Sequence, residues 1–209
     1  MKREINTNLV AVIAIFLAAS MFLGFSSEAQ VSVGAGYLGG KMKESQGGVS
    51  VNTTTYGFYA GASCKIPIHA TSLSFDPGLF YGYETGTMKI PGAGLGDIVL
   101  QDLYLPLKFR IDGAISGKLA LFASAGPMFG FGLNGEIRSS GVAVNLFDSS
   151  VMAGNTLKRF DLLFGMECGM IIFDHYQLRL GFDQGVLDVE DGETIAHRSS
   201  IHIGFAYGF

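Results

Sequence analysis

Bulky apolar residues recur at every second position in eight segments of the chain beyond residue 30. The segments span 31–37, 56–62, 73–83, 103–111, 119–131, 160–168, 178–182 and 201–209. In the last segment Ile201, Ile203, Phe205, Tyr207 and Phe209 alternate with small or polar residues. A period of two residues predicts β-strands that carry one apolar face. We therefore expect an all-β fold built from eight strands.

The connections between these segments alternate in length. The long ones, rich in Gly, Ser, Asn and Asp, span 39–54, 84–98, 133–157 and 185–197, and the short ones span 66–70, 112–117 and 172–176. Bacterial outer-membrane barrels have an even number of antiparallel strands, short periplasmic turns and longer extracellular loops. The pattern predicts an eight-stranded antiparallel transmembrane up-and-down β-barrel over residues 30–209. Both ends of this barrel are expected in the periplasm.

The second face of each segment decides between a membrane barrel and a soluble, lipocalin-like barrel, because both alternate. The side chains on this second face are small, as Gly57, Gly61 and Ser63 illustrate in one segment. Small side chains suit the narrow interior of an eight-stranded barrel, whereas a water-facing exterior favours charged residues. We therefore expect the bulky apolar set to face lipid.

Three prolines lie inside the expected strands: Pro77, Pro106 and Pro127. Proline lacks the backbone donor that a central strand needs. We expect a local bulge at each of them, or strand boundaries displaced by a few residues.

The N-terminus has the pattern of a secretory signal peptide. Lys2 and Arg3 precede an apolar stretch at 9–25, and Ser27-Glu28-Ala29 places small residues where signal peptidase reads them. We expect residues 1–29 to be removed by cleavage after Ala29, although a permanent N-terminal helix is the alternative. The predicted location is the cell outer membrane, with its lipid as the surrounding partner.

The composition is consistent with an outer-membrane barrel and excludes some kinds of ligand. Hydrophobic residues make up 48% of the chain and charged residues 15%, with 30 glycines and a net charge of −4. No basic surplus indicates a nucleic-acid partner. The four histidines lack metal-ligand spacing, so no cofactor is expected. Cys64 and Cys168 are expected as two separate apolar thiols, with a disulfide as the alternative.

Strand parity places eight charged side chains inside the barrel. They are Asp76, Asp102, Lys108, Arg110, Asp161, Glu167, Arg179 and Asp183. Unpaired charges are expensive in a narrow lumen, so we expect a structural network of ion pairs and hydrogen bonds. Lys108 and Glu167 lie at similar expected heights and are the first candidate pair. The alternative interpretation is a small cation-preferring pore.

An enzyme would need a nucleophile and a base. His197 and Ser199 resemble the His-x-Ser arrangement of outer-membrane lipid A deacylases, with Glu193 as the nearby carboxylate. The pair lies on the wrong strand for that family, so the chain is not expected to be an enzyme.

The final strand carries a second resemblance. Phe205, Tyr207 and Phe209 alternate up to the carboxyl terminus and resemble the C-terminal signal of outer-membrane barrels. That resemblance implies the barrel assembly machinery as a partner during biogenesis.

The stretch Tyr104–Phe109 reads Y-L-P-L-K-F and is similar to the prolyl strand of an outer-membrane β-barrel family common in Bacteroidetes, which includes PorT-like proteins. The segments 75–79, 125–127 and 165–169 contribute to the likeness. It covers the whole mature chain and implies an OmpX-like or OmpA-like barrel that carries mid-strand prolines. Most members have no assigned function, so the resemblance implies little about activity. We expect no peptidoglycan-binding domain after the barrel.

The long loops are the remaining place for function. Loop 133–157 is polar around a few apolar residues, and we expect it to extend its two strands as a hairpin above the membrane. Protruding strand edges bind other proteins by strand addition. The sequence therefore favours a structural or surface-interaction role, with an extracellular protein or surface ligand as a possible partner. A narrow passive channel is the alternative, and a lipid-modifying enzyme is the remote one.

Overall fold

The computed structural model describes residues 29–46, 49–68, 71–90, 94–139, 142–147, 156–187, 190–191 and 195–209. The predicted signal peptide, apart from Ala29, lies outside the described residues. Within these ranges no helix has the length and apolar character needed to cross a membrane.

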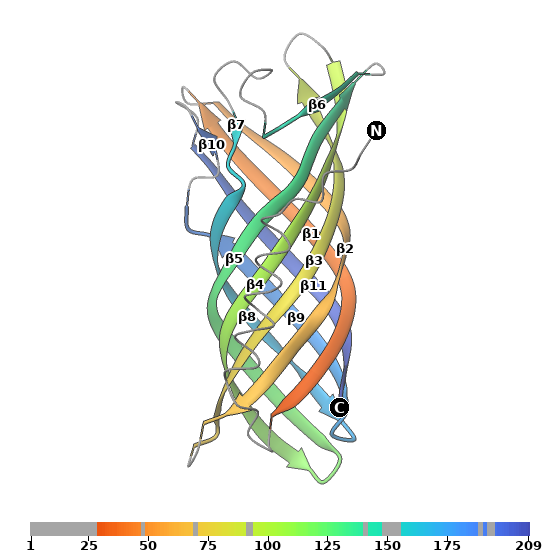
Figure 1. Ribbon diagram of the computed structural model, residues 1–209, viewed down its shortest axis with the longest axis vertical. Coiled ribbons are helices and arrows are strands. Elements are labelled where there is room, and N and C mark those ends of the chain that lie inside the picture. The colour runs from red at the N-terminus through yellow and green to blue at the C-terminus, as the bar shows by residue number, and fades with distance from the viewer. Residues whose placement is uncertain are drawn as a thin grey trace, which may run out of the picture.

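Eight long strands of the described chain form one closed antiparallel ring, which confirms the predicted fold class (Figure 1). In order around the ring they are β1 (Gln30–Gln46), β2 (Val49–Pro67), β3 (Leu73–Ile90), β4 (Gly94–Ser116), β5 (Leu119–Ser139), β8 (Phe160–Ile172), β9 (Tyr176–Gly185) and β11 (Ile195–Gly208). Each strand pairs with its neighbour in sequence order. Pairing of β1 with β11 closes the ring, from Ser32 opposite Gly208 to Ser45 opposite Ile195.

Three short strands gather at one end of the ring, which we call the outer end (Figure 1). Strand β6 (Val142–Asn145) folds back on β5, so loop 133–157 contains a hairpin. Of the two flanking strands only β5 is extended, to Ser139, because β8 begins at Phe160 and β6 is a separate strand. Strands β7 (Thr156–Leu157) and β10 (Glu190–Asp191) form a separate two-stranded sheet. The opposite end, with the tight turns after Ser116 and Ile172 and the last residue of β11, is the inner end.

The bulky apolar face of every ring strand points away from the lumen. Phe58 and Ile203 have 52% and 56% of their surface exposed, whereas their inward neighbours Tyr59 and His202 have 8%. Large apolar residues are exposed on seven of the eight ring strands, and the outward apolar residues of β3 are half-buried, so the outside of the ring carries an apolar belt. The inside holds small and polar residues, as parity predicts, together with two clusters of larger apolar side chains.

The prediction that residues 39–54 and 84–98 are loops is wrong. Most of both segments continues the strands, with β1 and β2 paired as far as Gln46 opposite Val49. Likewise β3 and β4 pair as far as Ile90 opposite Gly94, and β4 runs through 112–116 at the inner end. The polar composition marks where the strands leave the apolar belt, and backbone hydrogen bonds maintain the sheet beyond it.

The prediction of a bulge at each mid-strand proline is also wrong. The strand register is the same on both sides of all three prolines, and only the pairs beside each proline nitrogen are absent. Register shifts lie instead between Gln101 and Asp102 and between Ala114 and Ser116. Proline removes a donor without adding a residue, so it interrupts a ladder but leaves its register unchanged.

The register shift near the outer end changes which residues of β5 face inward. Asp102 lies opposite Gly132, but Gln101 lies opposite Asn134, so Leu133 is the extra residue. Beyond it Ile137 is buried, although odd-numbered residues of β5 face outward closer to the inner end. One inserted residue reverses parity because side chains alternate with a period of two.

Candidate functional site

The inward face of β4 passes through four layers of the lumen, from the inner to the outer end. Arg110 and Lys108 are charged, Tyr104 contributes to an apolar layer, Asp102 is charged again, and Leu100 belongs to a second apolar layer. All five side chains are at most 8% exposed. The lumen is therefore divided into two charged and two apolar layers rather than lined by a continuous polar wall.

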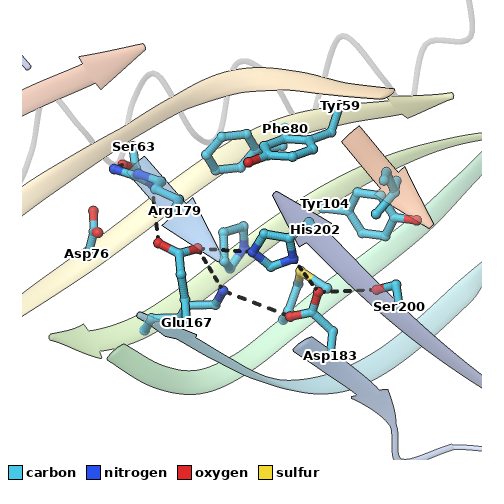
Figure 2. A pocket seen from close by; sticks show the side chains of 14 residues that line it. Tyr59, Ser63, Asp76, Phe80, Tyr104, Glu167, Arg179, Asp183, Ser200 and His202 are labelled. Atoms are coloured by element: carbon cyan, nitrogen blue, oxygen red, sulfur yellow. Dashed lines mark hydrogen bonds and ion pairs between the residues drawn. The ribbon is translucent and has the colours of Figure 1, made fainter. Parts of the chain in front are cut away.

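The inner charged layer is built around His202 (Figure 2). Its Nε2 lies 3.2 Å from Glu167 Oε2, and its Nδ1 lies 3.1 Å from Asp183 Oδ2. Ser200 Oγ donates to the same Asp183 oxygen over 3.2 Å. Lys108 Nζ lies 3.4 Å from Glu167 Oε2 and 3.9 Å from Asp183 Oδ1. Side chains from β4, β8, β9 and β11 thus meet across the barrel.

A chain of polar contacts continues from this cluster to the inner end. Arg179 lies 3.7 Å from Glu167 and donates to Gln177 Oε1 over 2.7 Å. Arg110 donates to the same Gln177 oxygen over 3.5 Å and to Asp112 over 2.8 Å. The guanidinium of Arg110 also lies 3.9 Å from the ring centroid of Phe122. These long side chains fill the inner half of the lumen.

An apolar layer covers the inner charged layer on its outer side. Its members are Leu38, Tyr59, Phe80, Tyr104, Met128 and Leu163. Tyr59 packs edge-on against both Phe80 and His202, with ring centroids 5.8 Å and 5.6 Å away. The layer separates the two charged layers of the lumen.

Arg198 is the centre of the outer charged layer. It donates to Asp102 Oδ2 over 2.8 Å and to the Tyr104 hydroxyl over 2.7 Å, and it also pairs with Glu84. The Thr55 hydroxyl donates to Glu84 as well. Glu84 is 1% exposed and the Arg198 side chain 11%. One guanidinium is therefore shared between two buried carboxylates.

Beyond this layer the strands enclose a second apolar core. Met42, Ile98, Leu100, Ile137 and Leu146 are buried against one another, with Met88 and Leu157 beside them. We call this part of the molecule the outer head. It consists of residues 41–46, 49–54, 85–90, 94–100, 133–139 and 195–197 together with β6, β7 and β10.

The end of the β5–β6 hairpin turns back over the mouth of the barrel. Phe147 lies over the bulge in β5, and the Arg159 guanidinium lies 4.4 Å from its ring centroid. Arg159 also donates to the Gly132 carbonyl over 3.0 Å and to the Leu133 carbonyl over 3.4 Å. The bulge supplies these acceptors because its carbonyls do not pair with β8.

All eight charged residues expected in the lumen have their side chains inside the ring. The structure joins Lys108 to Glu167 and Asp183, Arg179 to Glu167, Arg110 to Asp76, and Asp102 to Arg198. Asp161, at 7% exposed, lines the mouth near Phe147. We infer that these contacts hold the barrel wall together.

Sequence reasoning did not find Glu84 and Arg198. Glu84 fell in the segment 84–98, which was expected to be a loop, and Arg198 lay between the expected loop 185–197 and the apolar alternation that begins at Ile201. The available signal was parity. Glu84 continues the inward positions Asp76 and Gly82 of β3, and Arg198 continues those of His202 in β11. If the expected strands had included residues 84 and 198, parity would have placed both side chains in the lumen.

The aromatic residues of the C-terminal signal form one cluster at the inner end. Phe205, Tyr207 and Phe209 are 48%, 36% and 72% exposed on the outside of the wall. Tyr207 contacts Phe209 and Tyr176, with centroids 5.1 Å and 5.5 Å away. Recognition of these residues by the assembly machinery stays a prediction.

The remaining candidates do not form a reactive site in the described residues. Ser199 Oγ donates to the Lys41 carbonyl over 3.4 Å. The side chain of His197 and the whole of Glu193 lie outside the described residues. Cys64 and Cys168 are free thiols on the outer face, in β2 and β8.

No protein-family model and no curated protein matches the chain. Solved structures with a similar fold include the attachment invasion locus protein Ail of Yersinia pestis in complex with the heparin analogue sucrose octasulfate, at 11% identity, 87% and 99% coverage of this chain and of Ail, and a TM-score of 0.49. Neisserial surface protein A has 13% identity, 88% and 98% coverage and a TM-score of 0.46. The outer membrane protein OprG from Pseudomonas aeruginosa has 11% identity, 87% and 95% coverage and a TM-score of 0.37.

Such low identities and TM-scores leave the function of this chain to be argued from its own residues. The resemblance to the Bacteroidetes family stays a prediction.

Proposed function

We propose that the chain spans a bacterial outer membrane as a closed, non-catalytic barrel that presents the outer head for contact with an extracellular protein or surface ligand. The observation that carries the proposal is the second apolar core. Six ring strands continue beyond the belt, and five apolar side chains are buried among them and β6. A barrel needs no such core to cross a membrane, so the head is a folded structure built for use outside it.

The apolar belt supports the membrane assignment. Leu178, Leu180 and Phe182 of β9 are each more than 40% exposed along one face of a single strand. Contiguous apolar surface of this kind is unfavourable in water and suits hydrocarbon. The ring also leaves no open sheet edge at the level of the belt, as a lipid environment requires.

The outer surface of the head is polar and accessible. Lys41 and Lys43 of β1 and Thr54 of β2 are exposed on neighbouring strands. Further around the head Arg138 donates to Glu136 over 2.9 Å, which lowers the pKa of Glu136 below its ordinary value. The Glu136 charge is thus locally compensated, whereas the two lysines give the β1–β2 side a basic character suited to an acidic partner surface.

The layered lumen favours a closed barrel over the narrow channel that the sequence left as an alternative. We expect the purified protein in planar bilayers to show no steady conductance above a few tens of picosiemens, because charged and apolar side chains fill the cross-section at each layer. Single-channel recording at symmetric salt checks this. Stable steps of larger size that require the inserted protein would contradict the plugged lumen.

Charge reversal at Lys41 and Lys43 tests the surface role. Fluorescent vesicles carrying the protein are applied to immobilised collagen, laminin, fibronectin and mucin, with empty vesicles as background. We expect the Lys41→Glu/Lys43→Glu variant to retain at most about a fifth of the wild-type binding to the panel member that wild type prefers, because like charges repel across an interface.

The matched control is Lys118→Glu, which reverses an exposed lysine in the turn at the inner end. This control is expected to bind as wild type does. Wild-type vesicles that bind no panel member above background, or an equal loss in both variants, would count against recognition through the head.

A further inference from the structure

A cavity lies inside the barrel between the inner charged layer and the apolar layer (Figure 2). Its apolar side is lined by Leu38, Tyr59, Phe80, Tyr104, Pro106 and Met128. Its polar side includes Lys108, Arg179, Asp76 and the His202 cluster. Ligand sites in proteins have this composition, with mostly apolar walls and a few polar groups that fix orientation.

Two carboxylates on the wall of this cavity have a buried oxygen without a hydrogen-bond partner, Asp76 Oδ1 and Asp183 Oδ1. Asp183 Oδ1 lies 3.9 Å from Lys108 Nζ, so Asp76 is the better acceptor for an occupant. Asp76 is 6% exposed, and its Oδ2 lies 3.6 Å from the Arg110 guanidinium. Its Oδ1 is buried and has no hydrogen-bond partner. A buried carboxylate oxygen left without a donor is costly. The cavity therefore favours an occupant that brings a hydrogen-bond donor.

Both ends of the lumen are closed to a molecule approaching along the barrel axis. On the inner side Arg110, Gln177 and Arg179 fill the lumen, and on the outer side the Arg198 cluster and the core of the outer head cover it. An occupant that comes from water would have to displace one of these layers. Access from the lipid side of the wall needs no such displacement.

The wall beside the cavity has three gaps in its hydrogen-bond ladders. The absent pairs are Cys64–Pro77 and Lys65–Asp76 between β2 and β3, Gly78–Pro106 and Leu79–Leu105 between β3 and β4, and Leu107–Pro127 and Lys108–Gly126 between β4 and β5. Pro77 lies opposite Leu107, which in the unshifted register is level with Pro127. The gaps therefore form one row across four neighbouring strands.

Each gap follows from proline chemistry. A proline nitrogen carries no hydrogen, so the facing carbonyl of the preceding strand receives no bond. The row adjoins the cavity directly, because Pro106 lines it and Asp76, Lys108 and Met128 stand next to the row. At Gly126 an added Cβ would lie 2.3 Å from the Leu107 carbonyl oxygen. Only glycine fits there, so this position contributes no side-chain packing between β4 and β5.

We propose that this cavity is a binding site for a small, mostly apolar molecule that carries one hydroxyl group, and that the molecule enters from the bilayer through the row of prolines. The apolar walls take the body of the molecule. Asp76 Oδ1 accepts the hydrogen bond from its hydroxyl. The pairs missing beside Pro77, Pro106 and Pro127 let neighbouring strands separate locally at lower cost than elsewhere in the wall.

The test for the site compares 4-fluorophenol with 4-fluoroanisole, which has the same ring and lacks the donor. Fluorine NMR follows both probes with the full-length mature protein in lipid nanodiscs, and empty nanodiscs give the partitioning background. We expect saturable binding of the phenol and at least about tenfold weaker binding of the anisole, because the anisole leaves Asp76 Oδ1 unpaired. Equal binding of both probes, or no saturable binding up to about 1 mM, overturns the site.

Two variants locate the binding. Leu38→Phe fills the cavity from β1 without removing a charge and is expected to abolish saturable phenol binding. Asp76→Ala is expected to reduce the preference for phenol over anisole to near unity. Heat-modifiable migration on gels verifies that each variant folds. If Asp76→Ala does not fold, the probe pair on wild type still decides the role of the donor. Retained binding in folded Leu38→Phe overturns the site.

The entry route has its own test. Pro77 and Pro127 do not line the cavity, so the Pro77→Val/Pro127→Val variant restores two backbone donors without changing the site. We expect an unchanged affinity and an exchange rate of the phenol about tenfold slower or more. The control Leu79→Val/Phe129→Leu changes the lipid-facing side of the same strands and no donor. Equal exchange rates in wild type and both variants overturn entry through the wall.

Discussion

Replacing Arg198 by methionine is expected to destabilise the folded barrel by about 3–5 kcal/mol, the range for removal of one partner from a buried charge cluster. Arg198 is the guanidinium shared by Glu84 and Asp102 in the outer charged layer. Without it two carboxylates remain close together in a site where Glu84 is 1% exposed. The Thr55 and Tyr104 hydroxyls do not supply a compensating charge.

The measurement is the fraction of heat-modifiable barrel at each urea concentration, with the protein in vesicles. Arg138→Met is the matched control, because its ion pair with Glu136 lies on the surface with the Arg138 side chain 61% exposed. A loss below about 1 kcal/mol is expected there. A third variant, Arg198→Met/Glu84→Gln/Asp102→Asn, should recover part of the stability, since it removes the unbalanced charges together with the arginine. Equal stability of Arg198→Met and Arg138→Met would show that water reaches the cluster.

An arginine at position 180 is expected to destabilise the barrel in bilayers by about 2–4 kcal/mol, as measured for lipid-facing charges near the midplane of outer-membrane barrels. Leu180 is 46% exposed on the outside of β9 and lies midway between Tyr176 and Gln184 on the same face. If the belt faces hydrocarbon, the guanidinium there is far from both interfaces.

The matched control keeps the strand, the face and the introduced residue, and changes only depth. Gln184→Arg, at the outer end of β9, is expected to cost about 0–1 kcal/mol. The same urea series in vesicles gives both values. If the barrel lies in a membrane, the arginine at position 180 must destabilise it more than the arginine at position 184. Similar small costs at both positions would mean that the apolar belt does not contact lipid.

Much of the fold could be predicted because the main signal is local. In a strand the side chains of consecutive residues point to opposite faces. The alternation at 201–209 therefore predicts both the strand and which residues lie on each of its two faces. The same rule placed Lys108 and Glu167 on inward positions of β4 and β8. Their pairing followed from the cost of an isolated charge in a narrow lumen.

Strand ends were harder, because a strand continues for as long as a neighbour supplies hydrogen bonds. Residues 39–46 have a loop-like composition, yet Ser45 lies opposite both Ser50 and Ile195. Ile195 is distant in sequence from Ser45, and no pattern in residues 39–46 predicts that the two pair. For this reason Glu84 and Arg198 were missed, and Asp102 was the only charged residue of the outer charged layer that the sequence predicted.

The sequence by itself determined that the chain forms eight strands with an apolar face outward and a lumen of small and charged residues. Only the tertiary structure decided how far the strands run, that Leu133 reverses the faces of β5, and that the three prolines align in one row beside a cavity. The physical reason is that alternation is a property of consecutive residues. Strand length, bulge position and the alignment of prolines depend instead on which residues of distant segments lie opposite one another.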